Sequence, residues 1–79
     1  MLSAKSKGEI SERAALFLKA KLKRADVTYD ELAKRLKEYG LEETRDSIAS
    51  KLKRGSFPAT FFLACCGALN LKRVQLKDI

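Results

Sequence analysis

The sequence predicts an all-α domain of four or five helices, and three observations support this prediction. Apolar residues recur at helical spacing in three stretches, a glycine follows two of these stretches, and a fourth stretch, opened by a proline, is almost entirely apolar. The 79 residues allow one compact domain, with 46% hydrophobic and 34% charged residues. The longest N-terminal apolar run, Ala14 to Leu18, is shorter than the core of a secretory signal. We therefore expect a cytoplasmic protein with no membrane partner.

The first helix is predicted over residues 11–25, and the residues before it form a separate segment. Residues 1–10 carry lysines and show no apolar period, so we expect a flexible basic arm. The helix that follows presents one apolar stripe, beside which Ala15 and Phe17 lie. The stripe consists of Ala14, Leu18, Leu22 and Ala25.

Capping residues set the limits of the second and third helices. The run Thr28-Tyr-Asp-Glu31 predicts a capping box, in which the Thr28 hydroxyl accepts from the Glu31 amide and the Glu31 carboxylate reaches back to the Thr28 amide. This helix is expected over residues 29–39 and ends at Gly40, which tolerates a left-handed conformation. The third helix is expected over residues 44–54, with Thr44 as a possible N-cap and Gly55 at its end.

The fourth helix is expected to begin with Pro58, which fits the first helical position, and to continue to about Leu69, with Asn70 ending it. Because it is apolar on most sides, we expect it to be buried, with Phe61, Phe62, Leu63, Cys65, Cys66 and Leu69 supplying much of the core and Gly67 permitting close approach. The adjacent phenylalanines are interpreted as core residues rather than as a base-stacking platform. The full predicted core contains Leu18, Leu22, Leu32, Leu36, Ile48, Leu52, Phe61 and Leu69.

The C-terminal tail, residues 74–79, follows a domain that we place at residues 11–73. Its residues alternate between apolar and polar, which fits a short extended strand or a fifth helical turn. We expect Val74, Leu76 and Ile79 to help form a homodimer, or else to fold back over the first helix.

The residue types present exclude most catalytic and metal sites. Histidine, the commonest general base and metal ligand, does not occur, and the two cysteines, Cys65 and Cys66, are adjacent. We therefore predict reduced, packed thiols, no metal, no cofactor and no enzymatic activity. The formal charge of +7 instead favours a polyanionic partner, and every charged residue between Ser47 and Lys77 is basic.

Three blocks in order resemble the lambda repressor/Cro-like (XRE-type) helix-turn-helix family over residues 18–71. These are Thr-Tyr-Asp-Glu-Leu-Ala-Lys-Arg-Leu at 28–36, Ser-Lys-Leu-Lys-Arg-Gly at 50–55, and an apolar helix after Pro58 that ends in Ala-Leu-Asn-Leu at 68–71. The resemblance implies a helix-turn-helix fold in which the third helix enters the major groove, as in bacterial and phage transcriptional regulators. The chain is several residues longer than the family pattern between Ala33 and Gly55, so either Ile48 or Ala49 fits the inward position of that helix.

The candidate DNA contacts lie on the second and third helices. Arg45 can pair with guanine and Ser47 or Ser50 can bond base edges, whereas basic side chains neutralise phosphates. Several residues also have an alternative role without DNA. Arg45 could contact Glu42 or Glu43, and Tyr29 could cover the first helix. The basic residues that follow could simply be solvated. Predicted base contacts are Arg45, Asp46, Ser47 and Ser50, and predicted phosphate contacts are Thr28, Tyr29, Lys51, Lys53 and Arg54.

The predicted function is sequence-specific binding of double-stranded DNA. One module of this size offers a small interface, so we expect a homodimer on a two-fold site. The alternative is a protein-interaction module on the same helical fold, whose charge only maintains solubility.

Overall fold

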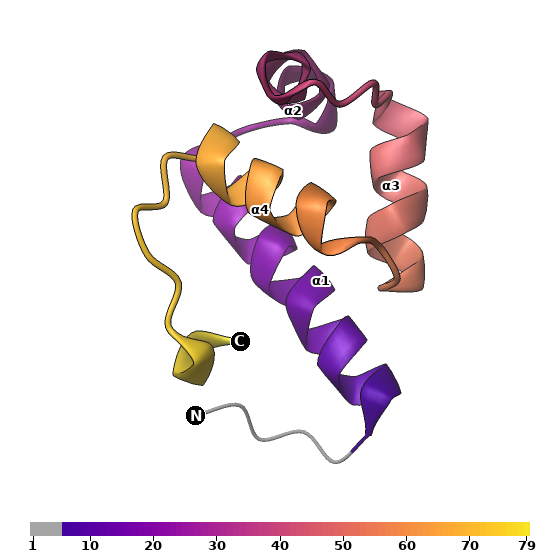
Figure 1. Ribbon diagram of the computed structural model, residues 1–79, viewed down its shortest axis with the longest axis vertical. Coiled ribbons are helices and arrows are strands. Elements are labelled where there is room, and N and C mark those ends of the chain that lie inside the picture. Colours follow the sequence, from indigo (N-terminus) through magenta and orange to yellow (C-terminus); the bar gives the residue numbers. More distant parts are fainter. Residues whose placement is uncertain (1–5) are drawn as a thin grey trace.

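The computed structural model describes residues 6–79 and confirms the all-α prediction. Within these residues there is no strand, and no helix is long and apolar enough to cross a membrane. Residues 1–5 of the predicted arm lie outside the described part of the chain. The elements in Figure 1 are four α-helices, α1 (Lys7–Ala25), α2 (Tyr29–Leu36), α3 (Arg45–Arg54) and α4 (Ala59–Ala68), and two 3-10 turns, η1 (Lys37–Tyr39) and η2 (Leu76–Asp78).

Helix α1 begins four residues earlier than predicted. The Ser6 hydroxyl accepts a hydrogen bond from the Glu9 amide at 3.2 Å, and this cap satisfies one of the amides that a helix start leaves unpaired. Residues 7–10 are therefore helical, and their assignment to a flexible arm was wrong. The end of the helix is as predicted, because Asp26 adopts the left-handed conformation at φ 57°.

Thr28, Thr44 and Gly55 cap α2 and α3 as predicted, but α2 ends at Leu36, three residues earlier than predicted, and residues 37–39 form η1. Pro58 is the N-cap of α4 rather than its first residue. Thr28 accepts from the Glu31 amide at 3.1 Å, but the Glu31 carboxylate accepts from Arg35 Nε at 3.0 Å instead of reaching back to Thr28. The reciprocal half of the predicted capping box is thus incorrect. Gly40 and Gly55 end their segments with φ of 78° and 67°, in the region that glycine occupies without strain.

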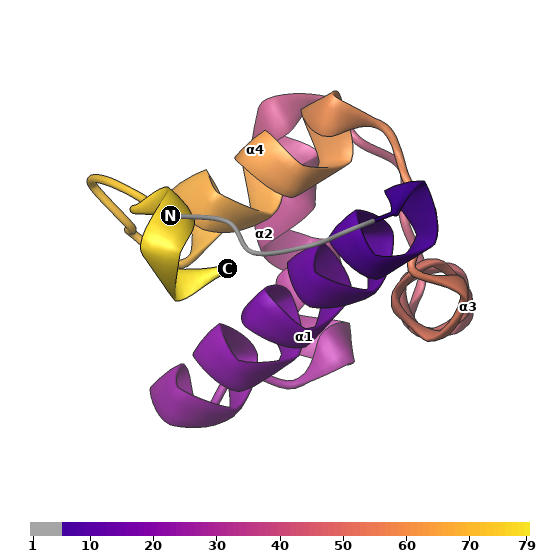
Figure 2. The same ribbon diagram turned by 90° about the horizontal axis from the view of Figure 1, so that it is seen from below.

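The core lies where α4 crosses α1 and contacts α2, with α3 at one edge of the molecule (Figures 1 and 2). Ile48 is fully buried and Ala49 only partly, so Ile48 is the inward residue of α3. The core prediction was wrong for Leu63, which is 66% exposed, and only partly right for Phe62 and Leu69, which are half-buried against the core. The other predicted core residues are buried: Leu18, Leu22, Leu32, Leu36, Leu52 and Phe61.

The close approach of another helix was predicted at Gly67, and the structure instead places the Tyr39 side chain of η1 there. A Cβ atom at Gly67 would lie 2.7 Å from Tyr39 Oη, which is closer than real atoms come. The absence of a side chain at Gly67 therefore lets Tyr39 lie against α4.

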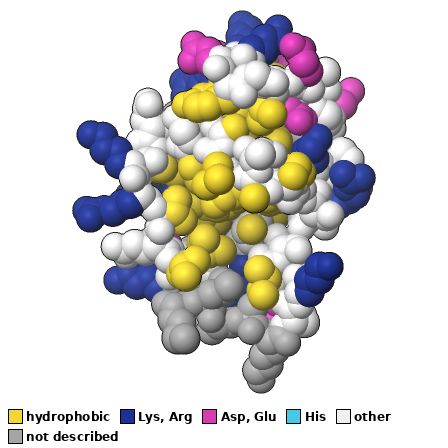
Figure 3. All heavy atoms as spheres, viewed as in Figure 1, with side chains coloured by type: hydrophobic (Ala, Val, Ile, Leu, Met, Phe, Trp, Pro, Cys, Tyr) yellow, Lys and Arg dark blue, Asp and Glu magenta, His cyan; other side chains and the backbone are white. Residues whose placement is uncertain are grey.

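Figure 3 shows apolar side chains gathered on the face where α4 lies in Figure 1, consistent with the exposed Leu63.

The tail folds back toward α1 (Figure 2). Arg13 donates from Nε, at 2.8 Å, and from Nη2 to the backbone oxygen of Ile79. Val74 and Ile79 are half-buried against the core, and residues 76–78 form the 3-10 turn η2. The tail therefore forms a short helical turn and not an extended strand. Val74 and Ile79 fold back within the same chain, which is the alternative to a tail that is free to form a dimer. Leu76 alone of the three apolar tail residues is exposed.

Candidate nucleic-acid interface

Helix α3 is held against the domain by one face and leaves the other open. Ile48 and Leu52, one helical turn apart, are buried between α1 and α2. The turn at Gly55 lies close to α1, with an added Cβ atom 3.4 Å from the Ser11 backbone oxygen. The opposite side forms what we call the α3 surface. It consists of the exposed residues Asp46, Ser50, Lys53 and Arg54, to which we add Arg45. Arg45 lies one turn before Ile48, on the side of the helix start that faces α2, and is exposed there.

Ser47 is a capping residue rather than part of the α3 surface. Its hydroxyl accepts from the Thr44 amide at 2.8 Å, while the Thr44 hydroxyl accepts from the Ser47 amide at 3.1 Å. The same Ser47 hydroxyl lies 2.7 Å from Glu43 Oε1, to which it donates. These bonds hold Ser47 half-buried at the start of α3. A base contact by Ser47 would have to break the reciprocal cap, so we remove it from the candidate readers.

Lys51 is tied to Glu43, a residue that the sequence analysis did not assign to the site. Lys51 Nζ lies 3.1 Å from Glu43 Oε1, and the two side chains are only 23% and 11% exposed. The ammonium group also lies 5.6 Å from the centre of the Phe61 ring, within range of a cation–π interaction. A phosphate contact by Lys51 would have to compete with these two contacts, which give the residue a structural role in the domain. Lys51 thus joins α3 to Glu43 in the preceding loop and to Phe61 on α4.

Arg45 contacts neither Glu42 nor Glu43, the two partners considered from the sequence. Its Nη1 atom lies 3.9 Å from Asp30 Oδ2 on α2, and both side chains are about two-thirds exposed. Such a pair contributes well under about 1 kcal/mol, because water screens it. Arg45 thus remains able to turn toward a ligand. The contact also places the start of α2 beside the start of α3.

Thr28 and Tyr29 lie at the start of α2, next to this pair. The Thr28 side chain is exposed and caps the helix, and Tyr29 is half-buried against the core, which matches its alternative packing role. Asp30 and Asp46 bring negative charge to this end of the α3 surface. Lys53 and Arg54 at the other end have no ion pair or side-chain hydrogen bond within residues 6–79. The α3 surface is therefore of mixed charge where the helix begins, with Arg45 beside Asp30 and Asp46, and basic where it ends.

The two cysteines are free and buried, as predicted. Burial, with smaller contributions from Cys66 and Glu43, raises the pKa of Cys65 to about 12, and burial also raises the pKa of Cys66. Their reactive thiolate forms are scarce at neutral pH. Within residues 6–79 there is no group of three or more acidic, cysteine or histidine side chains that could hold a metal ion.

Comparison with known proteins gives one match. A domain family described as "Domain of unknown function (DUF6471)" matches residues 11–74, which is most of the chain. No curated protein and no solved structure matches it. The matched range contains all four α-helices apart from the first turn of α1, so the α3 surface lies inside the shared domain.

Proposed function

The chain belongs to the DUF6471 family, and we propose that this member binds double-stranded DNA in a sequence-specific manner through α3. The proposed setting is the cytoplasm of a bacterium, where the protein, of bacterial or phage origin, acts as a transcriptional regulator. The resemblance of three sequence blocks to the lambda repressor/Cro-like family supports this proposal.

The observation that carries the proposal is the polar outer side of α3. Its exposed side chains are charged or hydroxylic, while its inner side is anchored by Ile48 and Leu52. Ten residues make a helix about 15 Å long, and the major groove is about 12 Å wide and admits an α-helix. Figures 1 and 2 place α3 at one edge of the molecule, where no other element overhangs it.

The proposed contacts follow from the position of each side chain on the α3 surface. Arg45 and Ser50 reach base edges, and Asp46 accepts from a cytosine amino group. Lys53 and Arg54 bind phosphates and fix the position of the helix without reading sequence. Thr28 and the amides of the α2 N-terminus offer a further phosphate contact, because helix N-termini attract anions. Lys51 and Ser47 support α3 from the side of the domain.

Replacing base-reading residues tests this assignment. Arg45→Ala is expected to cost about 1–3 kcal/mol of binding on the preferred duplex and little on an unrelated duplex, since it removes a base contact. Ser50→Ala should act in the same direction with a smaller effect. Fluorescence anisotropy with both duplexes measures the difference, and Lys34→Ala on the exposed side of α2 is the matched control. Equal losses on both duplexes would show that Arg45 reads no sequence.

The proposed working form is a homodimer on a two-fold DNA site, since one module of this size buries a small interface. Because Val74 and Ile79 pack within their own chain, the exposed Leu63 and Leu76 are the apolar groups that a dimer would cover. Sedimentation at micromolar protein, with and without Leu63→Asn, measures the association. A monomer at these concentrations would contradict the dimer, and an unchanged dimer in the variant would place the interface elsewhere.

A protein-interaction module is the second candidate function. Exposed Leu16, Leu63 and Leu76 favour it, because side chains of this size form protein contacts when they cluster. The two functions differ in salt dependence. DNA binding through Lys53 and Arg54 weakens steeply as salt rises, whereas an apolar protein contact does not.

A further inference from the structure

The cations outside α3 concentrate where the second half of α1 meets the tail. Residues 13–25 contain five basic and no acidic residues, and residues 71–77 contain three basic and no acidic residues. The fold brings these two segments together, since Arg13 binds the Ile79 backbone oxygen. Two adjoining hollows lie here, and Phe17, Lys21 and Asp78 line both of them. Arg24 also lines the first hollow, and Arg73 also lines the second. We call this region the α1–tail surface, with cations Lys21, Arg24, Arg73 and Lys77.

These cations are arranged for a ligand rather than for internal ion pairs. Arg24, Arg73 and Lys77 are exposed, and within residues 6–79 none of them has an ion-pair partner. Lys21 is held over the Phe17 ring at 5.4 Å, which fixes its ammonium group near the surface. Asp78 is the one acidic residue lining the two hollows in the described part of the chain. The net positive charge therefore faces solvent.

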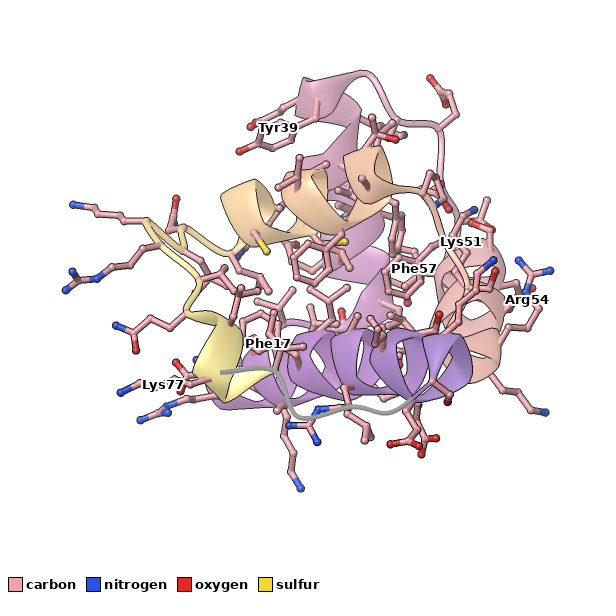
Figure 4. All side chains as sticks on the ribbon, turned by 60° about the horizontal axis from the view of Figure 1, so that its bottom comes forward. Phe17, Tyr39, Lys51, Arg54, Phe57 and Lys77 are labelled. Carbon is pink, nitrogen blue, oxygen red and sulfur yellow. The ribbon has the colours of Figure 1, made fainter. Side chains whose placement is uncertain are left out.

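The α1–tail surface lies on the side of the molecule opposite α3. Figure 4 shows Lys77 and Arg54 at opposite sides, and Figures 1 and 2 separate the tail from α3 in both directions of view. The molecule measures 34 × 24 × 21 Å. Charge interactions in water decay over about 8 Å at physiological salt. A straight duplex on α3 thus gains little from the α1–tail cations, which remain available to a second polyanion.

We propose that the α1–tail surface binds the phosphate backbone of a second DNA duplex, so that one chain bridges two duplexes. The hollows are wide and open and offer no hydrogen-bonding cage, and the groups around them are long, flexible cations, which suit a repeating backbone without sequence reading. The bridging role rests on the proposed function of α3 for the first duplex. The binding of phosphate by the α1–tail surface is independent of what α3 binds.

A bead-capture experiment tests the proposal with two matched double variants. Duplexes of about one helical turn, roughly 34–36 Å long, are too short to wrap from α3 to the tail. One duplex is fixed to beads and a fluorescent duplex is added with the full chain. Arg24→Glu/Arg73→Glu is compared with Lys34→Glu/Lys37→Glu on α2 and η1, which changes the net charge equally at exposed sites.

The wild type and the control variant Lys34→Glu/Lys37→Glu are expected to capture the fluorescent duplex equally well. The Arg24→Glu/Arg73→Glu variant is expected to capture at least about tenfold less of it. The salt slope of total duplex binding should fall by about two in that variant, one for each cation removed. Thermal unfolding confirms that all variants are folded. The proposal would be overturned if the wild type failed to bridge two duplexes, or if both double variants captured equal amounts of duplex. Equal capture is also the result expected if the α1–tail surface binds an acidic protein instead of DNA. If Lys53→Glu/Arg54→Glu binds normally while Arg24→Glu/Arg73→Glu does not, the proposed function of α3 fails and the α1–tail surface stands.

Discussion

Reversing the charge of Lys53 and Arg54 is expected to weaken duplex binding more than about tenfold at physiological salt. Both side chains are exposed at the basic end of the α3 surface and neither has an ion pair within residues 6–79. Each lost phosphate contact lowers the salt slope, the slope of log affinity against log salt concentration, by about one unit. Each introduced carboxylate also repels the DNA phosphates. Lys53→Glu/Arg54→Glu should therefore lose affinity for all sequences alike.

Lys51 provides the control on the same helix. Lys51→Gln breaks the ion pair with the nearly buried Glu43, and we expect it to lower the free energy of unfolding by about 1–3 kcal/mol. Its salt slope for duplex binding should equal that of the wild type, because this ammonium group contacts protein rather than phosphate. Anisotropy titrations over a range of salt separate the two variants. A salt slope about one unit shallower in Lys51→Gln, or a wild-type slope in Lys53→Glu/Arg54→Glu, would contradict the division of roles within α3.

Phe61→Ala is expected to lower the free energy of unfolding by about 3–5 kcal/mol, the largest stability effect that we predict. The Phe61 ring is 1% exposed, lies 5.3 Å from the Phe57 ring between centres, and carries the Lys51 ammonium at 5.6 Å. Its removal leaves a cavity where α4 meets α3. Small domains have total stabilities near the low end of about 5–15 kcal/mol, so much of the variant should be unfolded at room temperature.

Leu63, two residues further along α4, is the matched control. Because its side chain is 66% exposed, Leu63→Ala should change the free energy of unfolding by about 0.5 kcal/mol or less. Urea unfolding followed by circular dichroism measures both variants. A loss at Leu63 comparable to that at Phe61 would contradict the exposed position of this side chain in the monomer.

The caps were predictable because their signals are local. Thr28 begins α2, and Thr44 and Gly55 set the limits of α3, as the residue types indicate, while Gly40 ends the 3-10 turn η1 that follows α2. Ser6 carries the same kind of signal, with a glutamate three residues later, and could have been recognised. It was missed because Gly8 follows it and the apolar stripe begins further along the chain.

The exposed face of α4 was not predictable from its sequence. Its residues are apolar on most sides, so no periodicity distinguishes the buried Cys65 from the exposed Leu63. Only the positions of α1 and α2 decide which face is covered. The tail presents the same difficulty, because the contact between Arg13 and Ile79 joins residues at opposite ends of the chain.

The site was predicted only in part, for a similar reason. The spacing of Glu43, Ser47 and Lys51 by four residues hints at their network, but Glu43 precedes the helix, where helical spacing rules do not apply. The pair between Asp30 and Arg45 depends on how α2 and α3 pack. Burial of Ile48 rather than Ala49 is likewise a packing outcome, and it determines which residues form the α3 surface.

Selection from a random duplex library with the purified full chain tests the central claim most directly. We expect one recurring motif, still enriched at the higher of two salt concentrations and lost when Arg45 and Ser50 are both replaced by alanine. Base contacts survive salt better than phosphate contacts do, so a motif enriched at both concentrations indicates sequence reading. Recovery of duplexes without a motif, or a motif unchanged in the Arg45→Ala/Ser50→Ala variant, would contradict sequence-specific binding by α3.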